Sequence, residues 1–253
     1  MSKRLESFWN LRKEAESILR ELSKRREERL RSKAKPLDIV GWTEANRILK
    51  GGPFSFKDRD YLLPIYRNTS HRIIIMKARQ MEMTEFIVNW LLYNLITNPG
   101  VVGIYAAPRM DQVKRFSRDR FRKAIIDSPT LREYFEAAKE EYGIESLGRM
   151  PFNNGSVCYF ASAWDQFNAI RGIAADFVAL DEFQDMNAEA LPVIEETLSH
   201  SKHHRVLIVG TASDAGSEFH RLWLRTDQRE WDPERKAWVP KHQRQDDSNV
   251  GAK

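Results

Sequence analysis

The sequence predicts an α/β fold in which a mostly parallel central sheet is flanked by helices. Its 253 residues, 42% hydrophobic and 30% charged, are typical of a globular chain that can bury one sizeable core. After Pro36, short β-branched or apolar runs alternate with stretches whose apolar residues recur every three or four positions. This alternation is the pattern of parallel strands joined by crossover helices. We therefore expect one α/β domain with an N-terminal helical appendage.

Composition excludes several classes of protein. The longest apolar stretch, Phe86–Ile96, contains two asparagines and is much shorter than the roughly 20 residues that cross a bilayer. The N-terminus shows no apolar segment of the kind that directs secretion. Cys158 is the single cysteine, so no disulfide framework or multi-thiolate metal site is expected, and a reducing, cytosolic setting fits.

Residues 1–50 are expected to form a basic, amphipathic helical segment. The first 35 residues carry 12 Lys and Arg against 6 Asp and Glu, which leaves 29 of the 41 basic and 30 of the 36 acidic residues for the rest. The basic charge alone therefore does not indicate that the main domain binds nucleic acid. An apolar stripe recurs at helical spacing at Leu5, Phe8, Leu11, Ala15, Ile18 and Leu22. The helix either docks this stripe on the main domain or serves as an arm that contacts DNA or a partner.

The elements of the main domain follow from residue type and spacing. Runs of β-branched and apolar residues predict strands at His71–Lys77, Val101–Ala107, Ser156–Ser162, Asp176–Asp181 and Arg205–Gly210. Apolar residues three and four apart predict helices at Thr84–Thr97, Asp111–Ile126, Thr130–Glu140, Ala188–His200 and Ser217–Leu224. The sequence Asn153-Asn154-Gly155 predicts a type I′ hairpin turn, because Asn-Gly tolerates positive φ angles. Residues 232–253 are polar and are expected to be a tail or a truncated linker.

Two adjacent carboxylates follow the strand Phe177–Leu180. Ligands of open α/β sheets bind at the carboxyl ends of strands, which is where Asp181 and Glu182 lie. In nucleotide hydrolysis, a carboxylate in the Asp181 position holds Mg²⁺ and its neighbour polarises a water for attack on the γ-phosphate. Equally, both carboxylates could serve only to cap a following helix.

A phosphate-binding loop is expected upstream, between a strand and a helix. The segment in that context is Lys77-Ala78-Arg79-Gln80-Met81-Glu82-Met83-Thr84, and only Thr84 matches the G-x-x-x-x-G-K-[ST] pattern. Helix N-terminal N–H groups still favour a phosphate, the Thr84 hydroxyl can still reach Mg²⁺, and Lys77 and Arg79 supply cations. Glu82 opposes this role unless its carboxylate turns outward. Otherwise Lys77 and Arg79 are strand-end charges that reach solvent.

Several strings together resemble a known family. KARQMEMTEF, AIRGIAADFVALDEF, VGTASDAGSEFHRLW and TDQREW are similar in order and spacing to motifs of the ATPase domain of the large terminase subunit, the DNA-packaging motor of tailed bacteriophages. The resemblance covers Phe54 to Trp231. It implies a P-loop NTPase fold of the ASCE class, with an extra strand and a catalytic glutamate, over residues 51–231.

The resemblance also implies roles for residues. ATP would bind at Lys77–Thr84, with Mg²⁺ at Thr84 and Asp181, and Glu182 would be catalytic. Met83 occupies the position of the P-loop lysine. Lys77 at the head of the loop, or Arg79, would supply the cation in its place. Thr211, Ala212 and Ser213 would form the family's coupling motif.

Other side chains have two readings each. Tyr61 either stacks on adenine, as in the family, or is a core aromatic. Arg171 is either a charge sensor near the phosphates or a partner in a salt bridge. One of Arg118, Arg120 and Arg122 could act in trans at the phosphates of a neighbouring subunit. Otherwise these arginines form a solvated basic face. His203 and His204 indicate a surface turn rather than a metal site.

The resemblance implies a motor that uses ATP to move double-stranded DNA into a procapsid in the host cytoplasm. Its partners would be the portal protein, the small terminase subunit and further copies in a ring. Too few residues follow Trp231 for a nuclease domain, so an isolated and mainly monomeric motor domain is expected. Two alternatives remain open: a superfamily-2 helicase lobe, because DEFQ resembles a DExQ box, and a hydrolysis-dead nucleotide-binding assembly module, because Met83 replaces a lysine.

Overall fold

The computed structural model describes residues 37–142, 148–163, 172–187 and 190–240. The helix expected from the apolar stripe of residues 5–22 lies outside these ranges. The compact unit starts at Asp38, and helix α2 (Ile39–Asn46) packs in its core through Ile39, Val40 and Trp42. Residues 38–50 therefore fold with the main domain, although we expected them in the appendage. No helix among the described residues is long and apolar enough to cross a membrane.

The centre of the domain is a six-stranded sheet with the strand order β3-β8-β7-β4-β6-β5. Its members are β3 (Arg72–Lys77), β4 (Val102–Ala107), β5 (Arg149–Pro151), β6 (Val157–Ser162), β7 (Phe177–Leu180) and β8 (Arg205–Thr211). All neighbours are parallel except β5, which runs antiparallel to β6. Strand β3 precedes the predicted phosphate loop, and β7 precedes the carboxylate pair. Strand β8 lies between them, which is the strand order of the ASCE class. All five predicted strands are confirmed.

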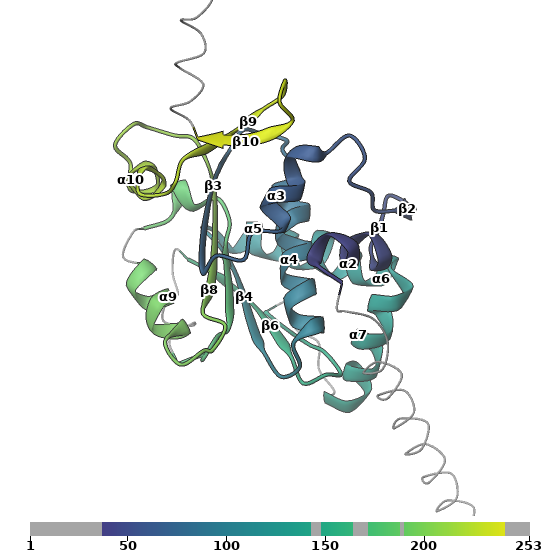
Figure 1. Ribbon diagram of the computed structural model, residues 1–253. Coiled ribbons are helices and arrows are strands. Elements are labelled where there is room, and N and C mark those ends of the chain that lie inside the picture. Colours follow the sequence, from purple (N-terminus) through teal and green to yellow (C-terminus); the bar gives the residue numbers. More distant parts are fainter. Residues whose placement is uncertain (1–36, 143–147, 164–171, 188–189, 241–253) are drawn as a thin grey trace, which may run out of the picture. The chain divides into compact units, whose positions relative to one another are not determined.

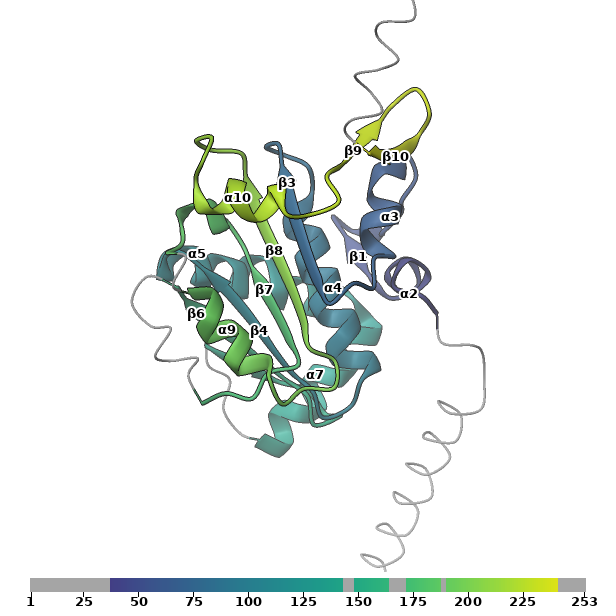
Figure 2. The same cartoon turned by 60° about the vertical axis from the view of Figure 1, so that its left-hand side comes forward.

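Helices cover both faces of the sheet, as Figures 1 and 2 show from two sides, and each face packs an apolar cluster. Phe177 and Ala179 of β7 belong to one buried cluster, whereas Val178 and Leu180 belong to the other. Because strand side chains alternate between faces, β7 is buried on both sides. The first layer holds α2, α3 (Leu63–Tyr66), α4 (Met83–Thr97), α5 (Met110–Arg115), α6 (Lys123–Asp127) and α7 (Pro129–Tyr142). The second holds α9 (Ala190–Leu198) and α10 (Glu218–Leu224).

Some elements differ from the prediction. The helix expected at Asp111–Ile126 is divided into α5, the π-helical segment η2 (Phe116–Arg122) and α6. The hairpin before β6 forms, but only Gly155 takes a positive φ (82°). The loop is therefore of the three-residue kind with a left-handed glycine, and the expected type I′ turn is wrong.

Short elements complete the described chain. They are η1 (Asp60–Leu62), η3 (Phe183–Asp185), the hairpin β1 (Ile48–Leu49)–β2 (Gly52–Pro53) and the hairpin β9 (Arg229–Asp232)–β10 (Ala237–Pro240). We expected a polar tail from residue 232, yet β10 pairs with β9 and Trp238 donates a hydrogen bond from Nε1 to the Tyr61 carbonyl oxygen at 2.8 Å. The buried Val239 and the two paired tryptophans, Trp231 and Trp238, supply the apolar contact that the tail prediction overlooked.

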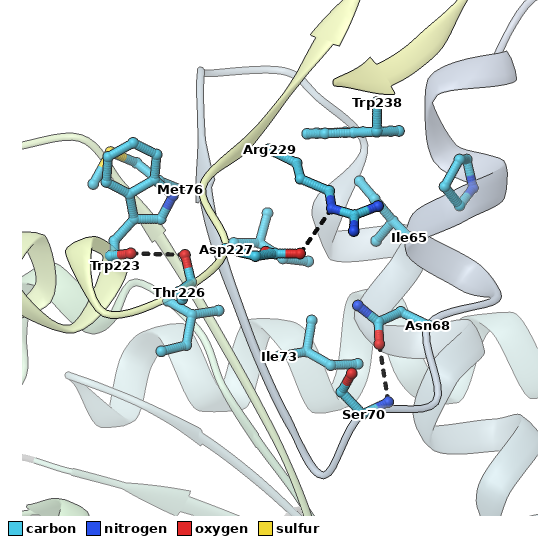
Figure 3. A pocket seen from close by; sticks show the side chains of 13 residues that line it. Ile65, Asn68, Ser70, Ile73, Met76, Trp223, Thr226, Asp227, Arg229 and Trp238 are labelled. Atoms are coloured by element: carbon cyan, nitrogen blue, oxygen red, sulfur yellow. Dashed lines mark hydrogen bonds and ion pairs between the residues drawn. The ribbon is translucent and has the colours of Figure 1, made fainter. Parts of the chain in front are cut away.

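One edge of β3 borders a pocket of about 380 Å³ in the described chain (Figure 3). Ile73–Met76 form one side of it, and Trp223 and Trp238 lie on other sides. An ion pair between Arg229 and Asp227, with Nε and Oδ2 2.7 Å apart, lies among the lining residues. None of the predicted nucleotide-binding residues lines this pocket, so it is separate from the candidate site.

Candidate functional site

The carboxyl ends of β3, β7 and β8 bring the predicted residues together. Lys77 and Thr211 are register partners at the ends of β3 and β8, and Asp181 and Glu182 directly follow β7. The Lys77 ammonium lies 2.9 Å from Oε1 of Glu182 and donates to Oγ1 of Thr211 at 3.4 Å. Three residues from three separate motifs therefore share one cluster, as their positions at parallel strand ends predict.

The Glu182 carboxylate is held from several sides. Its backbone is left-handed (φ 53°), and its Oε2 accepts hydrogen bonds from Nε2 of Gln184 at 2.9 Å and from Oγ1 of Thr211 at 3.4 Å. Burial favours the neutral form, but the hydrogen bonds and charge of Lys77, together with Gln184 and Thr211, outweigh it and lower the pKa of Glu182. The side chain is therefore ionised at neutral pH and can accept a proton or orient a water.

Asp181 is buried, with 8% of its surface exposed. Its Oδ2 accepts from the Tyr105 hydroxyl at 3.2 Å and its Oδ1 from the Glu182 N–H at 3.0 Å. Burial and the neighbouring Glu182 charge raise the pKa of Asp181 to about 6. Tyr105 itself stacks on Phe116, with ring centroids 3.6 Å apart.

The loop between β3 and α4 contains two non-glycine residues in the left-handed region, Gln80 (φ 61°) and Glu82 (φ 55°). Glu82 stands where the P-loop pattern has its second glycine, and its backbone takes the positive φ that a glycine would favour. The Glu82 carboxylate turns to Arg59, with Oε2 and Nε 2.6 Å apart. Its negative charge is thereby balanced by a cation from the preceding segment.

Two pockets meet at this loop. One, of about 520 Å³, lies between residues 80–85 and the β1–β2 hairpin and also contacts Lys77 and Arg59. The other, of about 480 Å³, lies over Asp181, Glu182 and Tyr105. Thr84 and Arg120 line both pockets. Each volume is in the range of small-ligand sites.

Residues 61–234 match the protein family described as phage terminase large subunit gpA, ATPase domain. The chain belongs to this family. Two solved structures have the same fold. The HK97 bacteriophage large terminase has a TM-score of 0.61 at 16% identity over 74% of this chain and 40% of that chain. The Thermus phage P74-26 large terminase ATPase domain has a TM-score of 0.55 at 23% identity over 80% of each chain.

The terminase ATPase fold is therefore shown, and the chain spans 40% of the length of the HK97 large terminase. Among curated proteins, no sequence match was found. The resemblance stated from KARQMEMTEF and the other strings is confirmed by the family match.

The three candidate arginines of this terminase domain lie in different surroundings. Arg118 pairs with Asp119 on the surface, with Nε and Oδ1 2.6 Å apart. Arg122 lines neither pocket at the loop, whereas Arg120 lines both. Arg120 contacts Glu85, with Nη1 and Oε1 3.5 Å apart, and Glu85 in turn contacts the buried Arg47 at 3.0 Å. Arg171 lies outside the described residues. Of the described three, Arg120 is thus the one placed beside the site.

Other predicted site residues lie further away. Tyr61 packs edge-on against Trp231, with ring centroids 6.3 Å apart, and lines neither pocket at the loop. Arg79 is exposed, and no hydrogen bond or ion pair joins it to another described residue. Ala212 and Ser213 are exposed beyond Thr211. His203 packs on Phe177 in a turn, and the described residues contain no group of three or more His, Cys, Asp or Glu that could hold a metal.

Several site residues could not be found from single motifs. Tyr105 and Gln184 contact the carboxylate pair, and Arg47 and Glu85 support Arg120. The available signal for Tyr105 is its position near the end of the expected strand Val101–Ala107. Gln184 lies in the DEFQ string, which we had linked only to helicases.

Asp181→Asn is expected to stabilise the metal-free protein at pH 8. The pKa of Asp181 is raised from its usual 3.8 to about 6, so above about pH 6 folding retains a buried charge that unfolding would release to water. The asparagine can still accept from the Glu182 N–H and donate to Tyr105. We expect the free energy of unfolding to rise by on the order of 2 kcal/mol at pH 8. Below about pH 3 Asp181 is mostly protonated in both states, so the variant should gain little there.

Urea denaturation in EDTA at both pH values measures this difference. The exposed Asp185→Asn is the matched control and should change neither value by more than about 0.5 kcal/mol. Destabilisation of Asp181→Asn at pH 8 would contradict the account of a buried charge.

Glu82→Gly is expected to tighten nucleotide binding. It removes a carboxylate from the pocket wall, releases Arg59 and lets the left-handed backbone relax, since a non-glycine residue there costs about 1–2 kcal/mol. We expect the Kd of an ATP analogue to fall roughly fivefold. Glu82→Gln removes the charge but keeps the backbone strain. It should therefore share the gain in affinity, but its melting temperature should be lower than that of Glu82→Gly. Equal or weaker binding by both variants, measured by calorimetry, would show that Glu82 does not face the phosphates.

Proposed function

We propose that this domain binds and hydrolyses ATP with Mg²⁺ and uses the energy to move double-stranded DNA into a procapsid. One observation carries the proposal. The cation of the loop motif meets the buried carboxylate and the candidate catalytic glutamate of a second motif at the carboxyl ends of the strands, with Lys77 and Glu182 2.9 Å apart. Membership of the terminase family gives this cluster its reaction class.

The roles of the residues follow from their positions. Lys77 would leave Glu182 and bind the β- and γ-phosphates, which attract its ammonium more strongly than one carboxylate does. Glu182 would then orient the attacking water. Residues Ala78–Thr84 would surround the phosphates with loop and helix N–H groups.

Thr84 and Asp181 would hold Mg²⁺. Both line the pocket of about 480 Å³ and offer a hydroxyl and a carboxylate oxygen, the donors that Mg²⁺ prefers. When bound, Mg²⁺ would neutralise charge on the phosphates. A nearby cation would also relieve the cost of ionising the buried Asp181.

The partners of the motor are part of the same proposal. Family membership favours double-stranded DNA, the portal protein, the small terminase subunit and a homo-oligomeric ring, working in the host cytoplasm. Residues 51–231, with residues 38–50 and the rest of the β9–β10 hairpin to residue 240 added from the structure, would be the motor domain. Residues 1–37 would be an appendage, and the last residues of the chain would lead to a further domain such as a nuclease.

Isolated protein is expected to hydrolyse ATP slowly, with a rate per subunit that rises with concentration. The reason is that an arginine lent by a neighbour, the role proposed for Arg118 or Arg122, would be missing from a monomer, whereas Arg120 lines the pockets of its own subunit. Phosphate release measured from dilute to concentrated protein, with Mg²⁺ and with EDTA, tests this. A Mg²⁺-dependent but concentration-independent rate would indicate a self-sufficient site. Nucleotide binding without turnover at any concentration would favour the hydrolysis-dead assembly module.

A further inference from the structure

Gln184 links two parts of the site that the sequence places 29 residues apart. Its amide nitrogen donates to Oε2 of Glu182 at 2.9 Å, and its amide oxygen accepts from the backbone N–H of Thr211 at 2.8 Å. This orientation of the amide is the one that chemistry requires. The reverse would place two acceptors together at Glu182 and two donors together at Thr211.

The chain leaves room for this bridge. A Cβ on Gly210 would lie 2.9 Å from Oε1 of Gln184 and 2.7 Å from the Phe219 ring, so the absence of a side chain at Gly210 lets Gln184 lie against the end of β8. The Gln184 amide also donates to Asp185 at 3.2 Å, but that residue is exposed and outside the cluster. The bridge therefore joins Glu182 to Thr211 specifically.

We propose that Gln184 is a positioning residue that holds the Glu182 carboxylate and passes its movement to the coupling segment Thr211–Ser213. The proposal rests on the proposed function. When phosphates take the Lys77 ammonium, Glu182 loses its ion pair and keeps its hydrogen bonds from Gln184 and Thr211. A shift of Glu182 would then pull on the amide, and through its oxygen on the backbone of Thr211.

Three variants separate the parts of the bridge. Gln184→Met keeps the length of the side chain and removes both hydrogen bonds. Gln184→Glu keeps an acceptor for the Thr211 N–H and loses the donor to Glu182. Asp185→Asn is the control. It changes the carboxylate outside the cluster to which the Gln184 amide also donates.

Hydrogen exchange of the full chain, with and without a non-hydrolysable ATP analogue and Mg²⁺, gives the deciding readout. In the unaltered protein the analogue should slow exchange at residues 77–84 and change exchange at the Thr211 amide. In Gln184→Met the change at Thr211 should be lost while protection at 77–84 persists. In Gln184→Glu the Thr211 amide should stay protected without the analogue, yet no longer respond to it.

Steady-state kinetics complete the test. We expect kcat to fall at least tenfold in both Gln184 variants with KM within about twofold, and Asp185→Asn to match the unaltered protein. A Thr211 response that survives in Gln184→Met would overturn the coupling role, and an unchanged kcat would overturn the positioning of Glu182. Lack of protection at 77–84 in the unaltered protein would overturn the proposed function, and this inference with it. Protection at 77–84 without any change at Thr211 would overturn the inference alone.

Discussion

Glu182→Gln is expected to abolish ATP turnover while nucleotide binding persists. The glutamine keeps the shape of the side chain but cannot take a proton, and catalysis of this kind contributes roughly 10²–10⁴-fold to a rate. The variant also removes the charge that holds Lys77 at 2.9 Å, so the ammonium should be freer to bind phosphates. We therefore expect kcat to fall by about 10³-fold and the Kd of ATP to stay equal or decrease.

Single-turnover hydrolysis and calorimetric binding measure the two quantities separately. Glu195→Gln is a suitable control, because this exposed carboxylate pairs with Arg72 at the opposite end of β3 from Lys77. Turnover of Glu182→Gln within twofold of the unaltered protein would disprove the assignment of Glu182 as the catalytic glutamate.

Lys77→Ala is expected to cost far more activity than Arg79→Ala. The Lys77 ammonium lies within the cluster, whereas Arg79 is exposed and has no hydrogen bond or ion pair to a described residue. Met83 cannot take over, because its thioether carries no charge and packs in the apolar core. Loss of one preorganised charge donor at a developing anion typically costs 10²–10³-fold. We expect that loss in kcat/KM for Lys77→Ala and a change of a few-fold for Arg79→Ala.

The two alanine variants control for each other, because both shorten a cation of the same loop. Circular dichroism and melting temperature confirm that each variant is folded. A dead Arg79→Ala beside an active Lys77→Ala would transfer the phosphate-binding role to Arg79. Normal rates in both would mean that neither side chain serves as the loop cation.

Much of the fold follows from the sequence, because its strands are continuous apolar runs. Strands β3, β4, β6, β7 and β8 begin and end within a residue or two of their predicted bounds. Strand β5 was missed, because three residues with a proline carry no periodic signal. The hairpin β9–β10 was missed because its apolar contacts come from two tryptophans separated by polar residues.

The site was predictable where a residue follows a strand and unpredictable where it depends on contacts through space. Lys77, Asp181, Glu182 and Thr211 each stand at a strand end, so parallel pairing alone brings them together. The support given by Tyr105 and Gln184 depends on register and side-chain geometry, which no local pattern contains. The same holds for the charge balance of Glu82 by Arg59, two residues 23 positions apart.

The π-helical segment Phe116–Arg122 has a consequence for comparing relatives of this protein. Its bonds close after five residues rather than four, so it accommodates extra residues within the length of an ordinary helix. Phe116 and Arg120 of this segment line the pocket over Asp181, so the segment lies directly beside the candidate site. A relative with a regular helix here would lack a residue, and the gap would fall inside the helix rather than in a loop.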